Sequence, residues 1–96
     1  MTATKRRTLP NDALKIDSKD NVAVATHPIA RGEAVVVNGA AVCKAIEDIP
    51  AGHKVALAPI PSGGKVIRYG EVIVVATRSI ARGEWVHVHN TRPVIK

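Results

Sequence analysis

Residues 29–35 read IARGEAV, and the same seven-residue pattern of Ile, two residues, Gly, two residues and Val recurs three more times. The other copies are IPAGHKV at 49–55, IPSGGKV at 60–66 and IARGEWV at 80–86. The second pair of copies follows the first pair at a constant offset, from position 29 to position 60 and from position 49 to position 80. The chain therefore contains one unit written twice, which predicts a pseudo-twofold arrangement.

Each copy of the pattern predicts a sharp corner between two extended segments. The Ile and Val anchor the two segments in a core, and the Gly between them can adopt a positive φ because it has no Cβ to clash. The segments between corners are too short for parallel crossovers, which need a dozen or more residues. We therefore predict a single all-β domain of short antiparallel strands with a pseudo-twofold internal repeat.

The predicted strands follow from runs of β-branched residues bounded by turn residues. They cover 14–17, 22–26, 35–37, 55–58, 66–68, 72–80 and 85–89. The stretch 41–49 also has apolar residues at helical spacing, but its counterpart in the second unit, 72–80, is rich in β-branched residues, so symmetry favours a strand. Asn38-Gly39 and Tyr69-Gly70 predict tight hairpin turns.

Length and charge limit the classes of protein. The 96 residues suit one small domain, which we place at 14–96, preceded by a flexible basic segment at 1–13 that contains Lys5, Arg6 and Arg7. The net charge is +6, but basic residues are interleaved with acids and no aromatic platform accompanies them, which argues against nucleic-acid binding. A small anionic substrate or an acidic partner surface fits this charge equally well.

Cysteine content and hydropathy indicate the compartment. Cys43 is the single cysteine, so the chain cannot form an internal disulfide. No apolar stretch is long enough for a signal peptide or a membrane span, and we therefore expect no membrane association and a cytoplasmic location.

The histidines are the strongest candidates for chemistry. On the predicted strand 85–89, His87 and His89 would project from one face, with Cα atoms about 6.5–7 Å apart. We place Trp85 on the opposite face. Such a pair can bind a divalent metal or place an acid and a base beside one substrate. Asn90 adds an amide that can orient a ring or a substrate hydroxyl.

Two further positions depart from a purely structural pattern. His53 and Lys54 occupy the turn of the second copy, where the other copies have Glu or Gly at the position of His53. Tyr69, in its predicted hairpin, can offer a hydroxyl to a ligand.

The eight acids do not cluster with the histidines in sequence, and a catalytic metal site commonly uses three protein ligands. We therefore expect another polypeptide to complete any catalytic site.

Four segments in this order resemble the SAF domain of the altronate and galactarate dehydratases. They are DNVAVA at 20–25, DIPAGHKVAL at 48–57, KVIRYG at 65–70 and GEWVHVHN at 83–90. The small subunit of sulfolactate sulfo-lyase is similar. The resemblance implies a β-clip fold and a hydro-lyase acting on a hydroxylated sugar acid. It also implies a site for an iron-like divalent metal, which a large catalytic subunit completes. Without that subunit this chain is expected to be inactive.

The resemblance also implies which residues lie near the substrate or metal. From their chemistry we expect His53, His87 and His89 to be catalytic, His87 and His89 to be metal ligands, and Asp20, Asn21, Lys54, Tyr69 and Asn90 to bind substrate. Many members have His where this chain has Trp85, which removes one potential ligand.

Two other readings of the sequence stay open. One is a non-catalytic β-clip module that binds a carbohydrate or a partner protein, and the other is a regulatory subunit that binds a sugar acid. Exposed strand edges also allow pairing of two copies of the chain.

Overall fold

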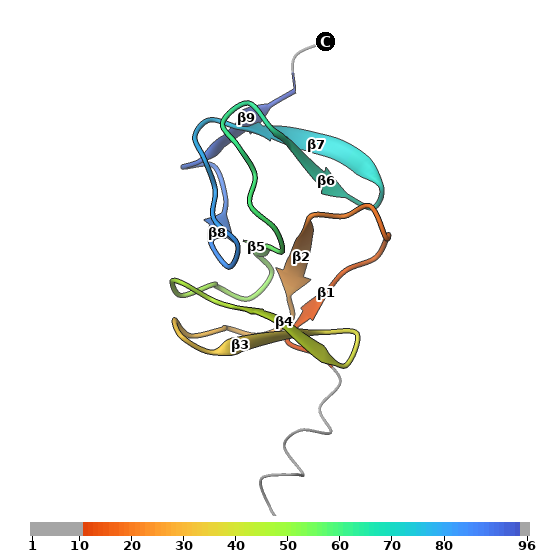
Figure 1. The fold of residues 1–96 in the computed structure, drawn as a ribbon, viewed down its shortest axis with the longest axis vertical. Coiled ribbons are helices and arrows are strands. Elements are labelled where there is room, and N and C mark those ends of the chain that lie inside the picture. The colour runs from red at the N-terminus through yellow and green to blue at the C-terminus, as the bar shows by residue number, and fades with distance from the viewer. Residues whose placement is uncertain (1–10, 95–96) are drawn as a thin grey trace, which may run out of the picture.

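The computed structural model describes residues 11–94, which form nine short β-strands and no helix (Figure 1). The strands are β1 (Ala13–Leu14), β2 (Val22–Ala25), β3 (Ala34–Val37), β4 (Ala40–Lys44), β5 (Lys54–Ala56), β6 (Lys65–Arg68), β7 (Glu71–Ala76), β8 (Trp85–Val86) and β9 (Thr91–Pro93). The basic run predicted in the N-terminal segment lies outside the described residues. Within 11–94, no helix could serve as a membrane span.

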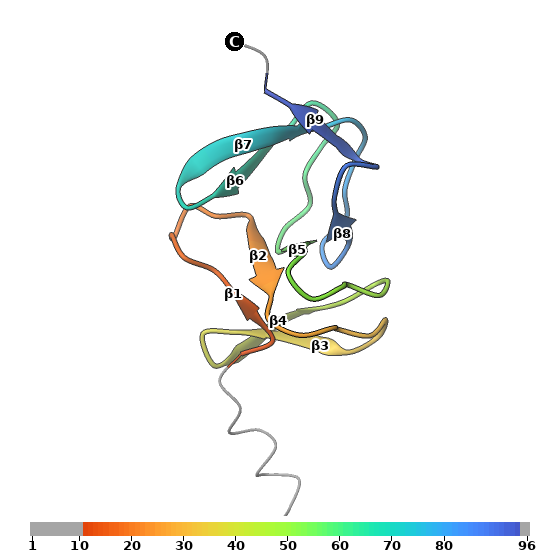
Figure 2. The ribbon, with the colours of Figure 1, turned by 180° about the vertical axis from the view of Figure 1, so that it is seen from behind.

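The strands form three antiparallel sheets. A central four-stranded sheet has the order β1-β2-β5-β8, and the hairpin β3–β4 lies on one side of it. The three-stranded sheet β6-β7-β9 lies on the other side, and both views of the ribbon show this layering (Figures 1 and 2). The predicted all-β class with short antiparallel strands is confirmed.

The four repeated corners have the predicted geometry. Their glycines all have positive φ, namely Gly32 (89°), Gly52 (81°), Gly63 (81°) and Gly83 (87°). Each corner begins and ends on a residue that is at most 2% exposed: Ile29 and Val35, Ile49 and Val55, Ile60 and Val66, Ile80 and Val86. The corners pair through the antiparallel bridges Ile29–Ile49 and Ile60–Ile80. The repeat in the sequence is therefore a repeat in space.

Backbone hydrogen bonds show the same symmetry. Each corner glycine donates its N–H to the carbonyl of a buried alanine: Gly32 to Ala45, Gly63 to Ala76, Gly52 to Ala25 and Gly83 to Ala56. The second and fourth of these pairs are the first and third moved on by the offset that separates the two units. Only a small side chain fits where a corner backbone approaches so closely, which explains the alanines.

The core consists of two apolar clusters, one for each half. The first contains Ala13, Ala23, Ala25, Ile29, Val35, Val37, Ala45, Ile49 and Val55, and the second contains Val22, Ala56, Ile60, Val66, Ala76, Ile80 and Val86. Both hold only aliphatic side chains. Residues 11–13, which the sequence analysis assigned to the flexible segment, belong to the folded part because Ala13 is fully buried and Asp12 pairs with Val36.

Both predicted hairpin turns are present. Asn38 and Gly39 have φ of 52° and 79°, and Tyr69 and Gly70 have φ of 58° and 75°. Two consecutive residues with positive φ form the turn whose twist matches that of the flanking strands. Tyr69 is unusual at such a position, because a left-handed backbone is costly for a residue with a large Cβ substituent.

Several predicted strands are longer than the observed ones. The strand at 14–17 ends at Leu14, because the side chain of Asp20 accepts hydrogen bonds from the N–H groups of Ile16 and Asp17 and bends the chain. The stretch 41–49 is strand only as far as Lys44, and the strand predicted at 72–80 ends at Ala76.

The strand predicted at 85–89 ends at Val86, which changes the placement of the histidines. His87 donates its N–H to the Oδ1 of Asn90, and Asn90 returns its N–H to the carbonyl of His87. Residues 87–90 are therefore a turn, which leads into β9 and its pairing with β7. The prediction that His87 and His89 share one face of a strand is wrong.

Candidate functional site

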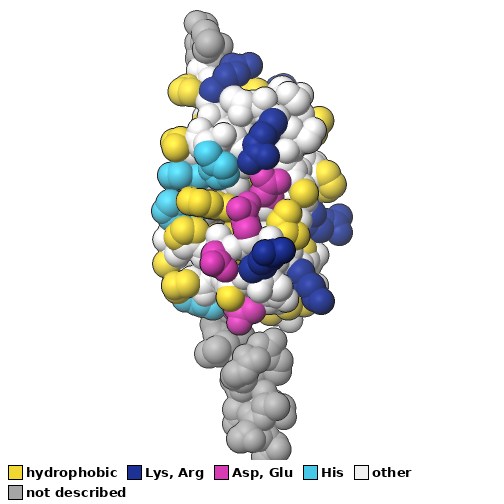
Figure 3. Space-filling model, turned by 90° about the vertical axis from the view of Figure 1, so that its left-hand side faces the viewer, with side chains coloured by type: hydrophobic (Ala, Val, Ile, Leu, Met, Phe, Trp, Pro, Cys, Tyr) yellow, Lys and Arg dark blue, Asp and Glu magenta, His cyan; other side chains and the backbone are white. Residues whose placement is uncertain are grey.

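Three histidine rings surround the indole of Trp85. The ring centroids of His53, His87 and His89 lie 5.6, 5.4 and 5.0 Å from that of Trp85, and the His87 ring is stacked on the indole at 10°. The prediction that Trp85 lies on the face opposite His87 and His89 is wrong, and even on a regular strand residues 85, 87 and 89 would share one face. We call these four residues the histidine–tryptophan group. In the space-filling view, His side chains gather along one edge, beside acidic side chains (Figure 3).

A hydrogen bond defines the proton position on His53. The indole Nε1 of Trp85 donates to the Nδ1 of His53 at 3.1 Å. Since Nδ1 accepts this bond, neutral His53 carries its proton on Nε2, an assignment that follows from the hydrogen-bond network. His53 thus presents a hydrogen-bond donor at Nε2.

The ring of His87 lies next to that of His53, and its nitrogens are available to a ligand. The two ring centroids are 4.6 Å apart. Within residues 11–94, the ring nitrogens of His87 form no hydrogen bond, in contrast to its backbone N–H. Partial burial, followed by the positive charges of His53 and Lys54, lowers the pKa of His87. The ring therefore favours the neutral form, which can accept a proton.

Lys54 and Arg68 form a second feature beside this group. Lys54 is on β5, opposite Val86 in the register of the central sheet, and on the sheet face that carries the second apolar cluster. Burial, and then the charge of Arg68 on β6, lower the pKa of Lys54. Arg68 has a buried Nε without a hydrogen-bond partner, and its guanidinium lies 4.5 Å from the ring centroid of Tyr69. Neither cation forms an ion pair with an acid of residues 11–94.

Asp20 serves the fold. Its carboxylate accepts hydrogen bonds from the N–H groups of Ile16, Asp17 and Gly70. Burial alone would raise the pKa of Asp20, but these bonds, led by that from Gly70, hold it below its ordinary value. The charged side chain thus fastens the β6–β7 turn to the start of β2.

Asn21 and Tyr69 lie at the same end of the molecule as Asp20. The side chain of Asn21 donates to the carbonyl of Lys65 and accepts from the N–H of Ile67, which ties β2 to β6. Tyr69 is 54% exposed in the adjoining turn. Figure 1 shows this turn on the side of the molecule opposite β8.

Asn90 is fully buried and shapes the turn that carries two of the histidines. Its Oδ1 accepts from the N–H of His87, and its Nδ2 donates to the carbonyl of Trp85 and to Glu84. Both ends of the amide are occupied by protein partners. Asn90 therefore positions His87 and His89 through the backbone.

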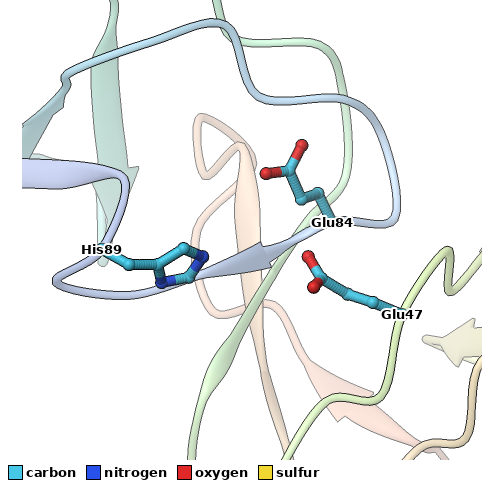
Figure 4. Close-up of side chains that lie close together, drawn as sticks. All are labelled: Glu47, Glu84 and His89. Carbon is cyan, nitrogen blue, oxygen red and sulfur yellow. The ribbon is translucent and has the colours of Figure 1, made fainter.

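The structure also places two acids that the sequence analysis missed beside His89. Ligand atoms of Glu47, Glu84 and His89 all lie within 4.8 Å of one another (Figure 4). The two glutamates belong to different units of the repeat, so no local spacing reveals the group. The contact arises because Ile46 donates its N–H to the carbonyl of Gly83.

The comparison with known families gives the same assignment as the four resembling segments. Residues 11–93 match the family described as the altronate/galactarate dehydratase SAF domain. The chain belongs to this family. The all-β architecture described above fits the β-clip fold expected of a SAF domain.

Three curated relatives share the SAF domain. The chain is 46% identical to altronate dehydratase of Escherichia coli K12 over 79 residues, which are 82% of this chain and 16% of that protein. It is 38% identical to altronate dehydratase of Bacillus subtilis 168, with the same coverage of both chains. It is 63% identical to galactarate dehydratase (L-threo-forming) of Escherichia coli K12 over 41 residues, 43% of this chain and 8% of that protein. The chain thus spans about one sixth of the length of the altronate dehydratases.

Within this SAF domain, the eight predicted site residues fall into two sets. His53, His87 and His89 lie together around Trp85. Lys54 follows His53 in sequence, and its positive charge contributes to the lowered pKa of His87. Asp20, Asn21 and Tyr69 lie at the β6–β7 turn, and Asn90 is buried beneath the histidines. A hollow elsewhere on the surface, lined by Pro28–Ala30, Glu33 and Asp48–Pro50, contains none of the eight.

Proposed function

We propose that this SAF domain supplies an acid–base histidine and substrate-orienting side chains to a hydro-lyase that removes water from a hydroxylated sugar acid. The observation that carries the proposal is the contact between His53 and His87, whose ring centroids are 4.6 Å apart beside Trp85. The names of the relatives, altronate dehydratase and galactarate dehydratase, support the substrate class.

The proposed proton route uses His87. Dehydration of a 2,3-dihydroxy acid removes the proton α to the carboxylate and expels the 3-hydroxyl. The proton passes from Cα to the free ring of His87, and His87 returns it to the departing hydroxyl, so that water leaves as the C–O bond breaks. The remaining enol becomes a 2-keto-3-deoxy acid by tautomerisation.

His53 has a different role in this scheme. Protonation of its Nδ1 would set two donors against each other, because Trp85 already donates to that atom. With Nδ1 occupied by this bond, His53 donates a hydrogen bond from Nε2 to a substrate oxygen. Two adjacent imidazoles thus act differently because only one of them is held by the indole.

Lys54 and Arg68 suit the carboxylate of the substrate. Both are partly buried, and each lacks an acid partner among residues 11–94. A bound carboxylate would offset their mutual repulsion and offer the buried Nε of Arg68 an acceptor. Lys54 adjoins His53 in sequence, and its positive charge contributes to the lowered pKa of His87.

The proposal includes a divalent, iron-like metal and a large catalytic polypeptide. When bound, such a metal lowers the cost of the negative charge that develops on the substrate. Oxygen and imidazole donors are available for it in this chain at Glu47, Glu84 and His89. We propose that the catalytic polypeptide completes the site, that this chain is inactive without it, and that the complex functions in the cytoplasm.

A chimera tests the proposal. Residues 11–93 replace the matched region of Escherichia coli altronate dehydratase, and the formation of 2-keto-3-deoxy acid from altronate and galactarate is measured beside a variant that lacks the region. We expect the chimera to dehydrate one of these acids and the deletion to be inactive. If the deletion retains full activity, the domain is a binding module and the proposed role is wrong.

A further inference from the structure

The strongest unexplained cluster is the group of Glu47, Glu84 and His89. Its members come from the segment after β4, the corner before β8 and the turn after β8, and their ligand atoms lie within 4.8 Å of one another. In the close-up, the two carboxylates and the imidazole approach a common region beside β8 (Figure 4). Three separate segments thus bring donors to one place.

Free acceptor positions remain in the group after its internal hydrogen bonds are satisfied. The Oε2 of Glu47 accepts from the N–H of Trp85, which leaves its Oε1 without a hydrogen bond in the described part of the chain. The Oε1 of Glu84 accepts one bond, from the N–H of Ala81, and retains a lone pair. The imidazole nitrogens of His89 form no hydrogen bond within residues 11–94. One free acceptor per residue is what a bound cation requires.

The repeat supplies an internal comparison. Glu33 is the equivalent of Glu84 in the first IARGE corner, and its Oε1 likewise accepts the N–H of Ala30. Closing the corner therefore explains one bond of Glu84 and its counterpart. It does not explain the approach of Glu47 and His89, and Glu33 belongs to no such group among residues 11–94.

The charges and burial of the group favour a cation of moderate affinity. Glu84 is 9% exposed and is held in place by Asn90 and by an ion pair with Arg78 at 3.2 Å. Two carboxylates and one guanidinium leave a net charge of −1 when His89 is neutral. The guanidinium weakens the attraction for a divalent ion without removing it.

We propose that Glu47, Glu84 and His89 bind a divalent transition-metal cation, with the remaining coordination positions open. Two carboxylates and one imidazole suit first-row ions such as Fe²⁺ and Mn²⁺, and three protein ligands with open positions are typical of catalytic rather than structural sites. This set replaces the pair His87 and His89 inferred from the family resemblance, and it leaves His87 free for proton transfer.

Binding of Mn²⁺ to the full 96-residue chain tests this site without substrate or partner. Loss of the electron paramagnetic resonance signal of free Mn²⁺ gives the dissociation constant. We expect one Mn²⁺ per chain, with Glu47→Gln and His89→Asn each weakening binding by about tenfold or more. Glu47→Gln keeps an acceptor for the N–H of Trp85, so the fold is preserved.

Glu33→Gln is the matched control, since it removes one carboxylate from the equivalent corner. We expect this variant to bind Mn²⁺ like the unsubstituted chain. The proposal is overturned if the unsubstituted chain binds no Mn²⁺ up to about 1 mM, if neither Glu47→Gln nor His89→Asn weakens binding, or if Glu33→Gln weakens it equally. Because the assay contains no substrate, failure here leaves the proposed dehydration by His87 standing, and failure of the chimera leaves this site standing.

Discussion

The indole Nε1 of Trp85 donates a hydrogen bond to the Nδ1 of His53 at 3.1 Å, and this bond distinguishes two neighbouring imidazoles. His53 is fixed as the tautomer protonated at Nε2, whereas the ring of His87, 4.6 Å away, has no such partner within residues 11–94. The indole of Trp85 thus serves as an orienting donor for His53.

Trp85→Phe tests this role of the indole. Phenylalanine keeps an aromatic ring between the histidines but has no N–H, so His53 should populate both tautomers. Nitrogen-15 chemical shifts of the His53 ring in the full chain report the tautomer directly. We expect the Nε2-protonated form in the unsubstituted chain and a mixture in Trp85→Phe; an Nδ1-protonated ring in the unsubstituted chain would contradict the assignment.

Gly83→Ala tests the contact that brings the two glutamates together. A Cβ at Gly83, where φ is +87°, would overlap the carbonyl oxygen of Lys44. Gly32 has φ of +89° and no atom within 4 Å of the equivalent Cβ position. Gly32→Ala therefore destabilises the fold only through the unfavourable positive φ of an alanine. We expect Gly32→Ala to cost about 1–2 kcal/mol, and Gly83→Ala to cost about 2 kcal/mol more because of the overlap. Urea unfolding of both variants measures the difference, and equal costs would show that the approach to Lys44 is not tight.

Lys54→Met tests the proposed carboxylate contact in the chimera. Methionine retains much of the packing of the lysine stem and removes its charge. We expect KM for altronate to rise by about tenfold or more, with a smaller change in kcat, because the charge binds a group that does not react. Lys65→Met, on the exposed end of β6, is the control and should leave KM unchanged. A fall in kcat alone after Lys54→Met would assign the lysine to the chemical step.

The pH dependence of stability has a predicted contribution from His27. A hydrogen bond to the carbonyl of Pro28, followed by the bond to Asp12 at 2.8 Å, raises the pKa of His27 above its ordinary value of 6.5. Protonated His27 therefore stabilises the fold below pH 6.5, and this contribution is lost as the pH rises through the higher folded-state pKa. The pair is exposed, so we expect about 0.5 kcal/mol or less.

The comparison of His27→Gln with the unsubstituted chain isolates this contribution. Unfolding by urea on both sides of the ordinary histidine pKa should show the unsubstituted chain losing more stability than the variant as the pH rises. The opposite sign would mean that the contact with Asp12 does not hold in solution.

The sequence predicts the corners of this fold well, because their physical requirements are local. A glycine with positive φ between an Ile and a Val is visible in any single copy, and the constant offset between the two units links the copies. The Asn38-Gly39 and Tyr69-Gly70 turns are predicted for the same reason, since the backbone angles depend on the residues themselves.

The site is less predictable, because it depends on contacts between distant segments. The alternation of Trp85, His87 and His89 predicts a strand, but the buried side chain of Asn90 bends the chain at His87. The bonds of Asp20 and Asn21 show equally that side chains predicted to bind substrate can be needed by the fold. Glu47 and Glu84 meet only after the corners have paired, and no spacing in the sequence encodes that pairing.

The most direct test of the central claim, that His87 transfers the proton, is the turnover of the chimera after His87→Ala. We expect kcat for altronate to fall by about a hundredfold or more, while His27→Ala, which removes a histidine outside the histidine–tryptophan group, leaves it unchanged. Matching thermal unfolding curves would show that both variants are folded. If kcat of the His87→Ala chimera stays within about twofold of the unsubstituted chimera, the claim is contradicted, because removal of a proton-transfer group lowers kcat far more than this.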